Sequence, residues 1–192
     1  MKYPGGIKQP VAKNINYGNR GTGLENDINI TNQYYRDIKK AIIHKKPTPI
    51  QITKVNYKSR QEVIIKEAFF KAPSTTDYNG IYQGKYIDFE AKETKSNTSF
   101  PLTNIHTHQI NHIKEVIEHG GISFLIIRFV QREQNFLLKG EDFISFLNEN
   151  KRRSLPISFF MEKGYLISEK YNPRLDYLEV VDKIYFGGEL NG

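Results

Sequence analysis

Residues 73–92 read PSTTDYNGIYQGKYIDFEAK, and the predicted fold is built around this stretch. Residues 75–82 are typical of a strand, and so is the second half, which ends in Phe-Glu-Ala-Lys. The sequence Gln-Gly-Lys at residues 83–85 is typical of a tight turn between them. The sequence therefore predicts a β-hairpin.

Acidic side chains would meet across this hairpin. Side chains alternate between the two faces of a strand, so Glu90 and Lys92 share one face. Folding back the first strand would bring Asp77 near Glu90. Two converging carboxylates favour a hard divalent cation, normally Mg²⁺. Lys92 beside them could stabilise charge on a phosphate oxygen or lower the pKa of an attacking water. This pattern indicates phosphodiester hydrolysis.

The spacing alone does not establish a nuclease, because an acid and a lysine two residues apart often form a solvated strand face. The surrounding sequence is more specific. It resembles the RecU family of Holliday junction resolvases, within the PD-(D/E)xK nuclease superfamily. The similar segments are HKKPTPIQI (44–52), PSTTDYNG (73–80), YIDFEAKETK (86–95), TSFPL (98–102), HQI (108–110) and PRLDYL (173–178).

The resemblance implies a fold, an activity and partners. The expected fold is α/β, with a restriction-endonuclease-like mixed sheet flanked by helices and a protruding stalk at about residues 46–72. The implied activity is Mg²⁺-dependent resolution of four-way DNA junctions by paired symmetric nicks in recombination and repair. Strand annealing and modulation of the recombinase are implied as well. The implied partners are junction DNA, a second copy in a homodimer, and recombinase and branch-migration proteins.

The resemblance also assigns roles to site residues. It makes Asp77 and Glu90 catalytic metal ligands, adds Thr75 and Gln109 to the metal site, and makes Lys92 the group that stabilises the transition state. Asp88 shares the face of Glu90 and could assist, but it lies outside the matched pattern.

A first helix is expected to begin at the capping box Thr22-Gly23-Leu24-Glu25 and to continue to about residue 43. The sequence His-Lys-Lys-Pro at residues 44–47 would end it. Glu25 has two interpretations. The capping box already explains it, but nucleases of this superfamily often carry an acid on a first helix that faces the metal site.

Candidate DNA contacts fall in and before the expected stalk. Residues 50–55 favour a strand, while residues 57–71 have mixed helix and strand signals. The resemblance places three side chains near the stalk tip, where an aromatic ring could stack on a base and cations could bind phosphate. An ordinary polar loop is the alternative. The candidates are Tyr57, Lys58 and Arg60 at the tip, and Lys45 and Lys46 before it.

A second helix is expected at residues 103–119, with Gln109 on its apolar face between Ile105 and Ile113. A buried amide needs partners, so Gln109 is either a satisfied core residue or the metal ligand that the resemblance implies. We predict no zinc site at the three nearby histidines, because only His108 and His112 lie one helical turn apart.

The remaining pattern completes the α/β prediction. Residues 122–129 are typical of a buried central strand, and residues 135–138 of a neighbouring strand. Short helices are expected at residues 141–147 and 173–186. A flexible basic tail at residues 1–20 would precede a single nuclease domain at residues 21–192.

Composition is consistent with these predictions. A net charge of +7 and a pI near 9.4 favour a polyanionic partner. The absence of cysteine excludes disulfides and thiolate zinc sites. The longest apolar run is too short to span a bilayer, and the N-terminus lacks the apolar core of a signal peptide. We therefore expect a cytoplasmic protein without a membrane partner.

Two other classes of function stay open. The chain could be a restriction-like endonuclease that reads duplex DNA, or a junction-binding protein without catalysis. The presence of Asp77, Glu90 and Lys92 together argues against the second class.

Overall fold

The computed structural model describes residues 23–57, 63–71 and 75–187. Its elements, in chain order, are α1 (Leu24–Asp37), β1 (Ile42–Lys45), β2 (Ile50–Tyr57), β3 (Val63–Phe70), β4 (Tyr78–Tyr82), β5 (Lys85–Thr94), β6 (Ser99–Pro101), η1 (Leu102–Asn104), α2 (Thr107–Glu118), β7 (Ile122–Phe129), η2 (Val130–Arg132), β8 (Gln134–Lys139), α3 (Gly140–Glu149), β9 (Ser154–Pro156), α4 (Ile157–Lys163), β10 (Tyr165–Leu166) and α5 (Tyr177–Tyr185).

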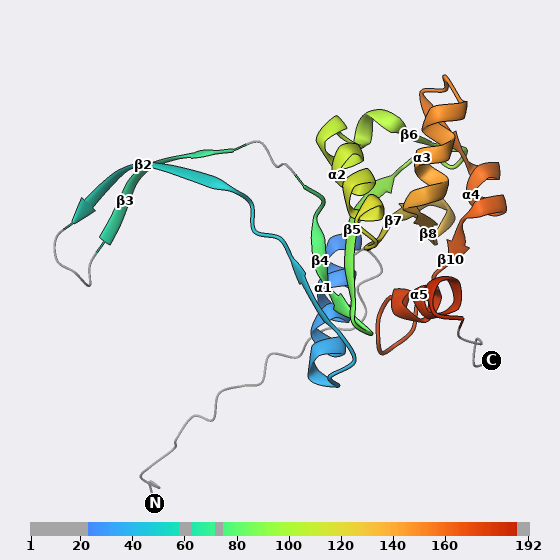
Figure 1. Cartoon of the computed structure of the whole chain (residues 1–192), viewed down its shortest axis with the longest axis horizontal. Coiled ribbons are helices and arrows are strands. Elements are labelled where there is room, and N and C mark those ends of the chain that lie inside the picture. The colour runs from blue at the N-terminus through green and yellow to red at the C-terminus, as the bar shows by residue number, and fades with distance from the viewer. Residues whose placement is uncertain (1–22, 58–62, 72–74, 188–192) are drawn as a thin grey trace, which may run out of the picture.

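One mixed sheet forms the centre of the molecule (Figure 1), with the strand order β1-β4-β5-β7-β8-β10. Strands β5 and β7 run parallel, and each of the other neighbouring pairs is antiparallel. The expected α/β fold, with a mixed sheet flanked by helices, is confirmed.

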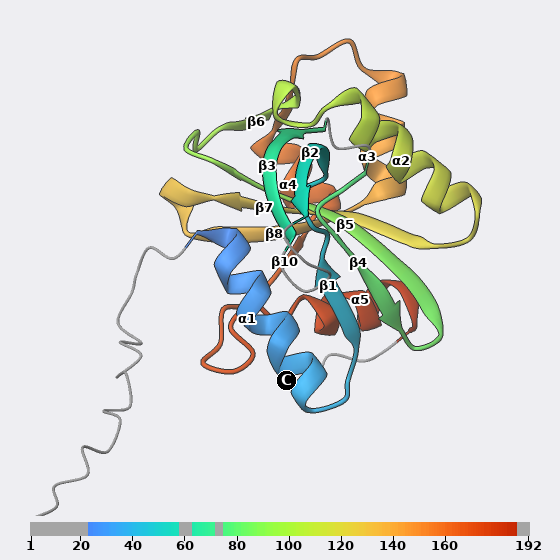
Figure 2. The same ribbon diagram turned by 90° about the vertical axis from the view of Figure 1, so that its left-hand side faces the viewer.

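Helices cover both faces of this sheet (Figures 1 and 2). Helices α1 and α5 enclose an apolar core that includes Phe89 and Leu178. On the other face, α2, α3 and α4 enclose a second core that includes Ile113 and Leu125. Because side chains alternate along β5, the neighbours of Phe89 on that strand project toward α2. The polar side of β5 therefore lies under a helix rather than in open solvent.

The predicted hairpin is present as β4 and β5, with Tyr78 opposite Phe89 and Tyr82 opposite Lys85. Gln83 and Gly84 form its turn, with φ values of 46° and 74°. Two successive positive φ values match the right-handed twist of the flanking strands. The local sequence thus sets the register that brings the site residues together.

A glycine makes room for the neighbouring strand. Gly80 of β4 lies opposite Ile43 of β1, and a Cβ atom on Gly80 would lie only 2.0 Å from the Ile42 carbonyl oxygen. Only a residue without a side chain permits this close approach of β1 to the hairpin.

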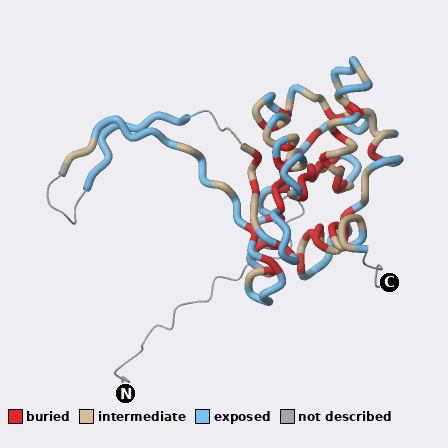
Figure 3. The backbone as a smooth tube through the Cα atoms, viewed as in Figure 1, coloured by how far each residue is buried: buried red, intermediate tan, exposed pale blue. Residues whose placement is uncertain are grey.

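Strands β2 and β3 form a separate antiparallel two-stranded sheet, called here the β2–β3 ribbon. It projects away from the central sheet (Figure 1), and most of it is exposed (Figure 3). It occupies the part of the chain where the stalk is expected. The mixed signals of that region are resolved as strand from Val63 to Phe70.

Helix α1 is shorter than predicted, which corrects the expectation that it continues to about residue 43. It ends at Asp37, and Lys39 then adopts a left-handed φ of 57°. Residues Ile42–Lys45 are a strand, with Ile43 buried and Ile42 exposed. The apolar residues that extended the helical pattern therefore alternate along an edge strand instead.

Other boundaries also differ from the sequence prediction. Helix α2 begins at Thr107 rather than residue 103, because a 3-10 turn precedes it. Helix α5 begins at Tyr177 rather than residue 173, after a cis peptide bond at Asn172-Pro173. The short elements β6, β9, α4 and β10 were not predicted. Within the described residues, no helix combines the length and the apolar character needed to cross a membrane.

Candidate active site

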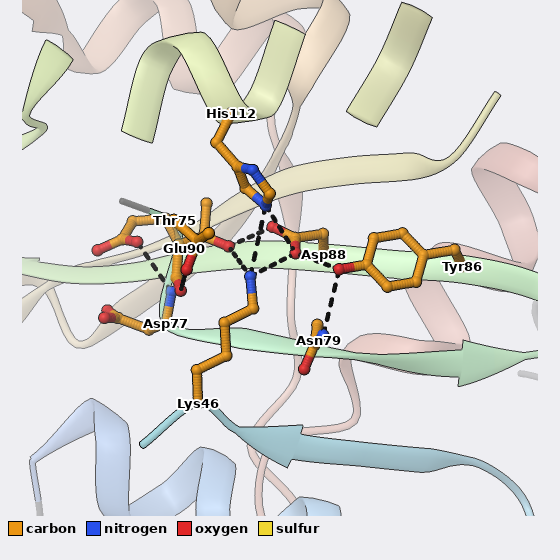
Figure 4. A network of polar contacts seen from close by, with 9 residues as sticks. Lys46, Thr75, Asp77, Asn79, Tyr86, Asp88, Glu90 and His112 are labelled. Atoms are coloured by element: carbon orange, nitrogen blue, oxygen red, sulfur yellow. Dashed lines mark hydrogen bonds and ion pairs between the residues drawn. The ribbon is translucent and has the colours of Figure 1, made fainter. Parts of the chain in front are cut away.

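The hairpin brings the predicted carboxylates together (Figure 4). Asp77 lies just before β4, and its backbone N–H donates to Glu90 Oε2 at 3.1 Å. The carboxylates of Asp77 and Glu90 point to the same side of the hairpin. Two carboxylates from the two halves of the hairpin therefore lie on the same side of it, where one cation could contact both.

Lys92 completes this group from the same face of β5. Its ammonium forms an ion pair with Glu90 and lies 3.8 Å from Asp77 Oδ2. The Lys92 side chain is 27% exposed, whereas that of Glu90 is fully buried. Glu90 is therefore shielded from solvent, whereas the side chains of Lys92 and Asp77 are partly exposed.

Asp77 affects the protonation of the buried Glu90 carboxylate. Burial, followed by the hydrogen bond with the Asp77 side chain and the negative charge of that side chain, raises the pKa of Glu90 from 4.5 to about 8. Burial acts to lower the pKa of Lys92, but the Glu90 and Asp77 carboxylates outweigh it and the net shift is upward. Burial thus favours the neutral form of Glu90, and the charge of Lys92 opposes this effect.

Thr75 and Gln109 are placed differently relative to this cluster. Thr75 lies beside Asp77 and Glu90 and is half-buried (Figure 4). Gln109 is buried in the first turn of α2, where its Oε1 accepts a hydrogen bond from the His106 N–H at 2.9 Å. Gln109 thus closes a capping box, a role that was not predicted. Its carbonyl oxygen has a second lone pair that could still meet a ligand.

Glu25 lies at the rim of the cluster. Its carboxylate bonds Lys45 Nζ at 2.5 Å, and its backbone carbonyl accepts a hydrogen bond from the Tyr78 hydroxyl at 3.3 Å. The Glu25 charge also contributes to raising the pKa of Lys92, after the larger effects of burial, Glu90 and Asp77. The first residue of the predicted capping box, Thr22, lies outside the described residues. Gly23 occupies the N-cap of α1 without a side-chain cap.

The predicted DNA contacts fall into two groups. Lys45 is exposed beside Glu25, but Lys46 turns inward and bonds Asp88 Oδ2 at 2.6 Å. Lys58 and Arg60 lie outside the described residues, as does the side chain of Tyr57.

A polar network centred on Asp88, which was not predicted from the sequence, lies beside the acidic cluster (Figure 4). The side chain of Asp88 is fully buried. It receives hydrogen bonds from the Tyr86 hydroxyl at 2.9 Å and from the Thr76 hydroxyl, and its Oδ2 lies 3.1 Å from His112 Nε2. The one signal in the sequence was that Asp88 shares a strand face with Glu90. Its partners Lys46 and His112 come from elements far away in the chain.

Three histidines lie at the N-cap and in the first half of α2, and they form no metal cluster among the described residues. His106 and His108 stack with their ring centroids 5.4 Å apart. Burial, His106 and Lys92 together lower the pKa of His108. His112 is turned toward Asp88 instead.

Comparison with known proteins relates the whole chain to one family. The family model RecU, described as recombination protein U, matches residues 19–183. A Holliday junction resolvase RecU from Geobacillus sp. (strain WCH70) is 52% identical over 198 residues, covering 97% of this chain and 98% of the relative. The protein of the same name from Bacillus thuringiensis (strain Al Hakam) is 52% identical over 182 residues, covering 93% and 90%.

A more distant likeness is found among solved structures. Hjc from Archaeoglobus fulgidus, a Holliday junction resolvase from an archaeal hyperthermophile, is 10% identical with a TM-score of 0.40, covering 70% of this chain and 93% of Hjc. Family membership instead follows from the match over residues 19–183 and from the 52% identity with full-length relatives. The chain belongs to the RecU family.

Proposed function

We propose that this chain is an Mg²⁺-dependent endonuclease that resolves four-way DNA junctions by paired symmetric nicks. The observation that carries the proposal is the cluster of Asp77, Glu90 and Lys92 in a chain 52% identical to proteins named Holliday junction resolvase RecU. The family likeness suggests the substrate, and the two carboxylates beside a lysine suggest phosphodiester hydrolysis.

The donor set suits a hard cation. Asp77 and Glu90 offer carboxylate oxygens, and Thr75 and Gln109 offer neutral oxygens, which are the ligands that Mg²⁺ takes in proteins. The side chain of Glu90 is fully buried, and its ion pair among the described residues is with Lys92. When bound, Mg²⁺ would supply Lewis-acid stabilisation of the charge on the phosphate.

The remaining roles belong to the side chains themselves. Asp77 and Glu90 would hold the cation between the two segments of the hairpin. Lys92 remains charged at neutral pH because its pKa is raised, so it can stabilise the charge that develops on a phosphate oxygen. Glu25 is a candidate additional acid at the rim, and Lys45 beside it is a candidate phosphate contact.

The β2–β3 ribbon supports the proposal of a homodimer. Its register pairs Ile50 with Phe70, and these residues are 50% and 83% exposed. A two-stranded ribbon is marginally stable by itself, and exposed apolar patches usually mark an interaction surface. A second copy related by a two-fold axis would cover the ribbon and would place two sites on the two opposed strands of a junction.

A nicking assay tests the activity. A four-way junction and a linear duplex of matched sequence are compared with Mg²⁺ and with EDTA. The proposal requires cleavage of the junction alone, and only with the cation. Equal cutting of the duplex would favour a restriction-like enzyme, and binding without cutting would favour a non-catalytic protein. Strand annealing and recombinase binding stay predictions from the family resemblance.

A further inference from the structure

The buried Asp88 network lies where the β2–β3 ribbon joins the central sheet. The chain leaves the sheet through residues 46–49, here the outgoing root, and returns through residues 75–77, here the returning root. The Lys46 N–H donates to the Asp77 carbonyl oxygen at 2.8 Å, directly beyond the last paired residues of β1 and β4. At the ribbon end, the Lys71 N–H donates to the Pro49 carbonyl oxygen at 3.0 Å.

Asp88 binds both roots at once. Lys46 of the outgoing root approaches Asp88 Oδ2 to 2.6 Å, and Thr76 of the returning root donates its hydroxyl to Asp88 Oδ1. Lys46 Nζ also lies 3.1 Å from Thr76 Oγ1, so the three side chains form a closed triangle. His112 of α2 contacts the same carboxylate, with its Nε2 3.1 Å from Asp88 Oδ2.

This triangle also adjoins the candidate metal site along the chain. Thr76 lies between Thr75 and Asp77, and Asp88 precedes Glu90 by two residues on the same face of β5. A shift of the returning root, which carries Asp77, would therefore move Asp77 relative to Glu90 on β5.

We propose that Asp88 is a positioning residue that fixes the direction of the β2–β3 ribbon relative to the candidate active site. Asp88 itself need not contact DNA or cation in this role, because it acts through Lys46 and Thr76. The proposal rests on the proposed nuclease function only for its effect on cleavage. The effect on ribbon direction can be measured in a protein of any activity.

The chain is suited to such a measurement because it contains no cysteine. Spin labels would be attached at Lys66→Cys on β3 and Glu118→Cys on α2, both of them exposed positions. Electron paramagnetic resonance then gives the distance distribution between ribbon and body. Dilution of labelled protein into an excess of unlabelled protein restricts the signal to distances within one chain.

Three variants divide the network into its parts. Asp88→Asn removes the ion pair to Lys46, and Thr76→Val removes the hydrogen bonds of Thr76 with Asp88 and Lys46 while the Lys46–Asp88 ion pair remains. Tyr86→Phe is the matched control, because Tyr86 lies on the same strand as Asp88 and its hydroxyl bonds Asp88 and Asn79, neither of which belongs to a root. The expected result is a broader or shifted distribution in the first two variants and an unchanged distribution in Tyr86→Phe.

Cleavage gives a second, separate readout. In Asp88→Asn and Thr76→Val, kcat on a four-way junction should fall by about tenfold to a hundredfold, because a misplaced reacting group has effects of this order. The KM for the junction should change much less. Thr76→Val keeps the buried ion pair, so it serves as the test where Asp88→Asn does not fold by circular dichroism.

The outcomes separate the two proposals. A broadened distribution in a protein that cuts no junction supports the positioning role and removes the proposed function. Unchanged distributions in the folded variants overturn the positioning role, even where the wild type cuts junctions as proposed. A change of the same size in Tyr86→Phe also overturns it, because the ribbon would then respond to any loss of polarity around Asp88.

Discussion

The Asp77 backbone N–H donates to the Glu90 carboxylate at 3.1 Å, so the main chain of one acidic residue contacts the side chain of the other. This bond leaves the Asp77 carboxylate free to point to the same side as that of Glu90 (Figure 4). Lys92 then lies within 3.8 Å of Asp77 while it pairs with Glu90. The register of the hairpin sets this arrangement. Because the three charged groups lie so close together, a change in the charge of any one of them affects the other two.

Neutralising any member of this cluster should abolish cleavage without abolishing junction binding. We expect Asp77→Asn, Glu90→Gln and Lys92→Ala each to lower the cleavage rate by at least about a hundredfold, because groups that stabilise a transition state have effects of this order. Binding depends mostly on many phosphate contacts elsewhere. Single-turnover cleavage and gel-shift titrations would measure the two properties, with the exposed Glu118→Gln as control. A variant with a near-normal rate would remove that residue from the mechanism.

The stability of the metal-free protein should depend on pH through Glu90. Its pKa is raised from 4.5 to about 8 on folding, so between these values the folded state retains a proton that the unfolded state has lost. The Glu90 contribution to stability is therefore present at low pH and is lost as the pH rises toward 8.

Urea unfolding in EDTA would test this dependence. We expect Glu90→Gln to gain stability relative to the wild type from pH 5 to pH 8, because glutamine has no proton to lose. A difference between the two proteins that stays constant across this range would contradict the pKa shift.

Replacing Gln109 with leucine separates its two roles. Loss of the hydrogen bond that Gln109 accepts from His106 should lower the free energy of unfolding by about 1 kcal/mol. If Gln109 is also a metal ligand, as we propose, the Mg²⁺ concentration for half-maximal cleavage should rise in addition. The control is Asn111→Leu, at an exposed position of the same helix. Lower stability with an unchanged Mg²⁺ requirement would leave Gln109 with the capping role alone.

The apolar pair on the β2–β3 ribbon should control the oligomeric state. We expect the double variant Ile50→Ser, Phe70→Ser to be monomeric at micromolar concentration, while the wild type has the mass of a dimer by light scattering. The matched control is Lys54→Ser, Glu67→Ser, which removes an exposed ion pair from the same ribbon. A monomeric wild type would exclude the proposed dimer.

The predicted tip contacts can be tested by charge and by stacking. Replacing Tyr57, Lys58 and Arg60 together with serine should lower the affinity for a four-way junction more than the affinity for duplex DNA. The reason is that bases at an open junction centre are available for stacking. Competition binding would give the ratio of the two affinities, and an unchanged ratio would exclude a junction-specific role.

The local parts of the fold could be predicted from the sequence, whereas contacts between distant elements could not. The hairpin follows from a turn and two short alternating segments, so the common face of Glu90 and Lys92 was predictable. The strand at Ile42 was missed because its apolar residues also fit the end of the preceding helix. The inward position of Lys46 could not be read from a basic cluster, because its partner Asp88 lies 42 residues away.

The same distinction applies to Gln109. Its burial was predictable from helical spacing, but its bond to His106 depends on where the helix begins. The sequence pattern placed that beginning at residue 103, and the structure places it at Thr107. An error of one turn in a helix start was enough to hide the capping role.

The pairing of Lys45 with Tyr78 has a consequence for how such a protein can change over time. The chain leaves the sheet and returns to it at adjacent positions, so the ribbon is inserted at a single point of the body. Residues can be added to or removed from the ribbon without altering the pairing of any central strand, and the entropic cost of a longer insertion grows slowly. The length of the ribbon can therefore change during evolution while the strands that carry the site residues keep their pairing.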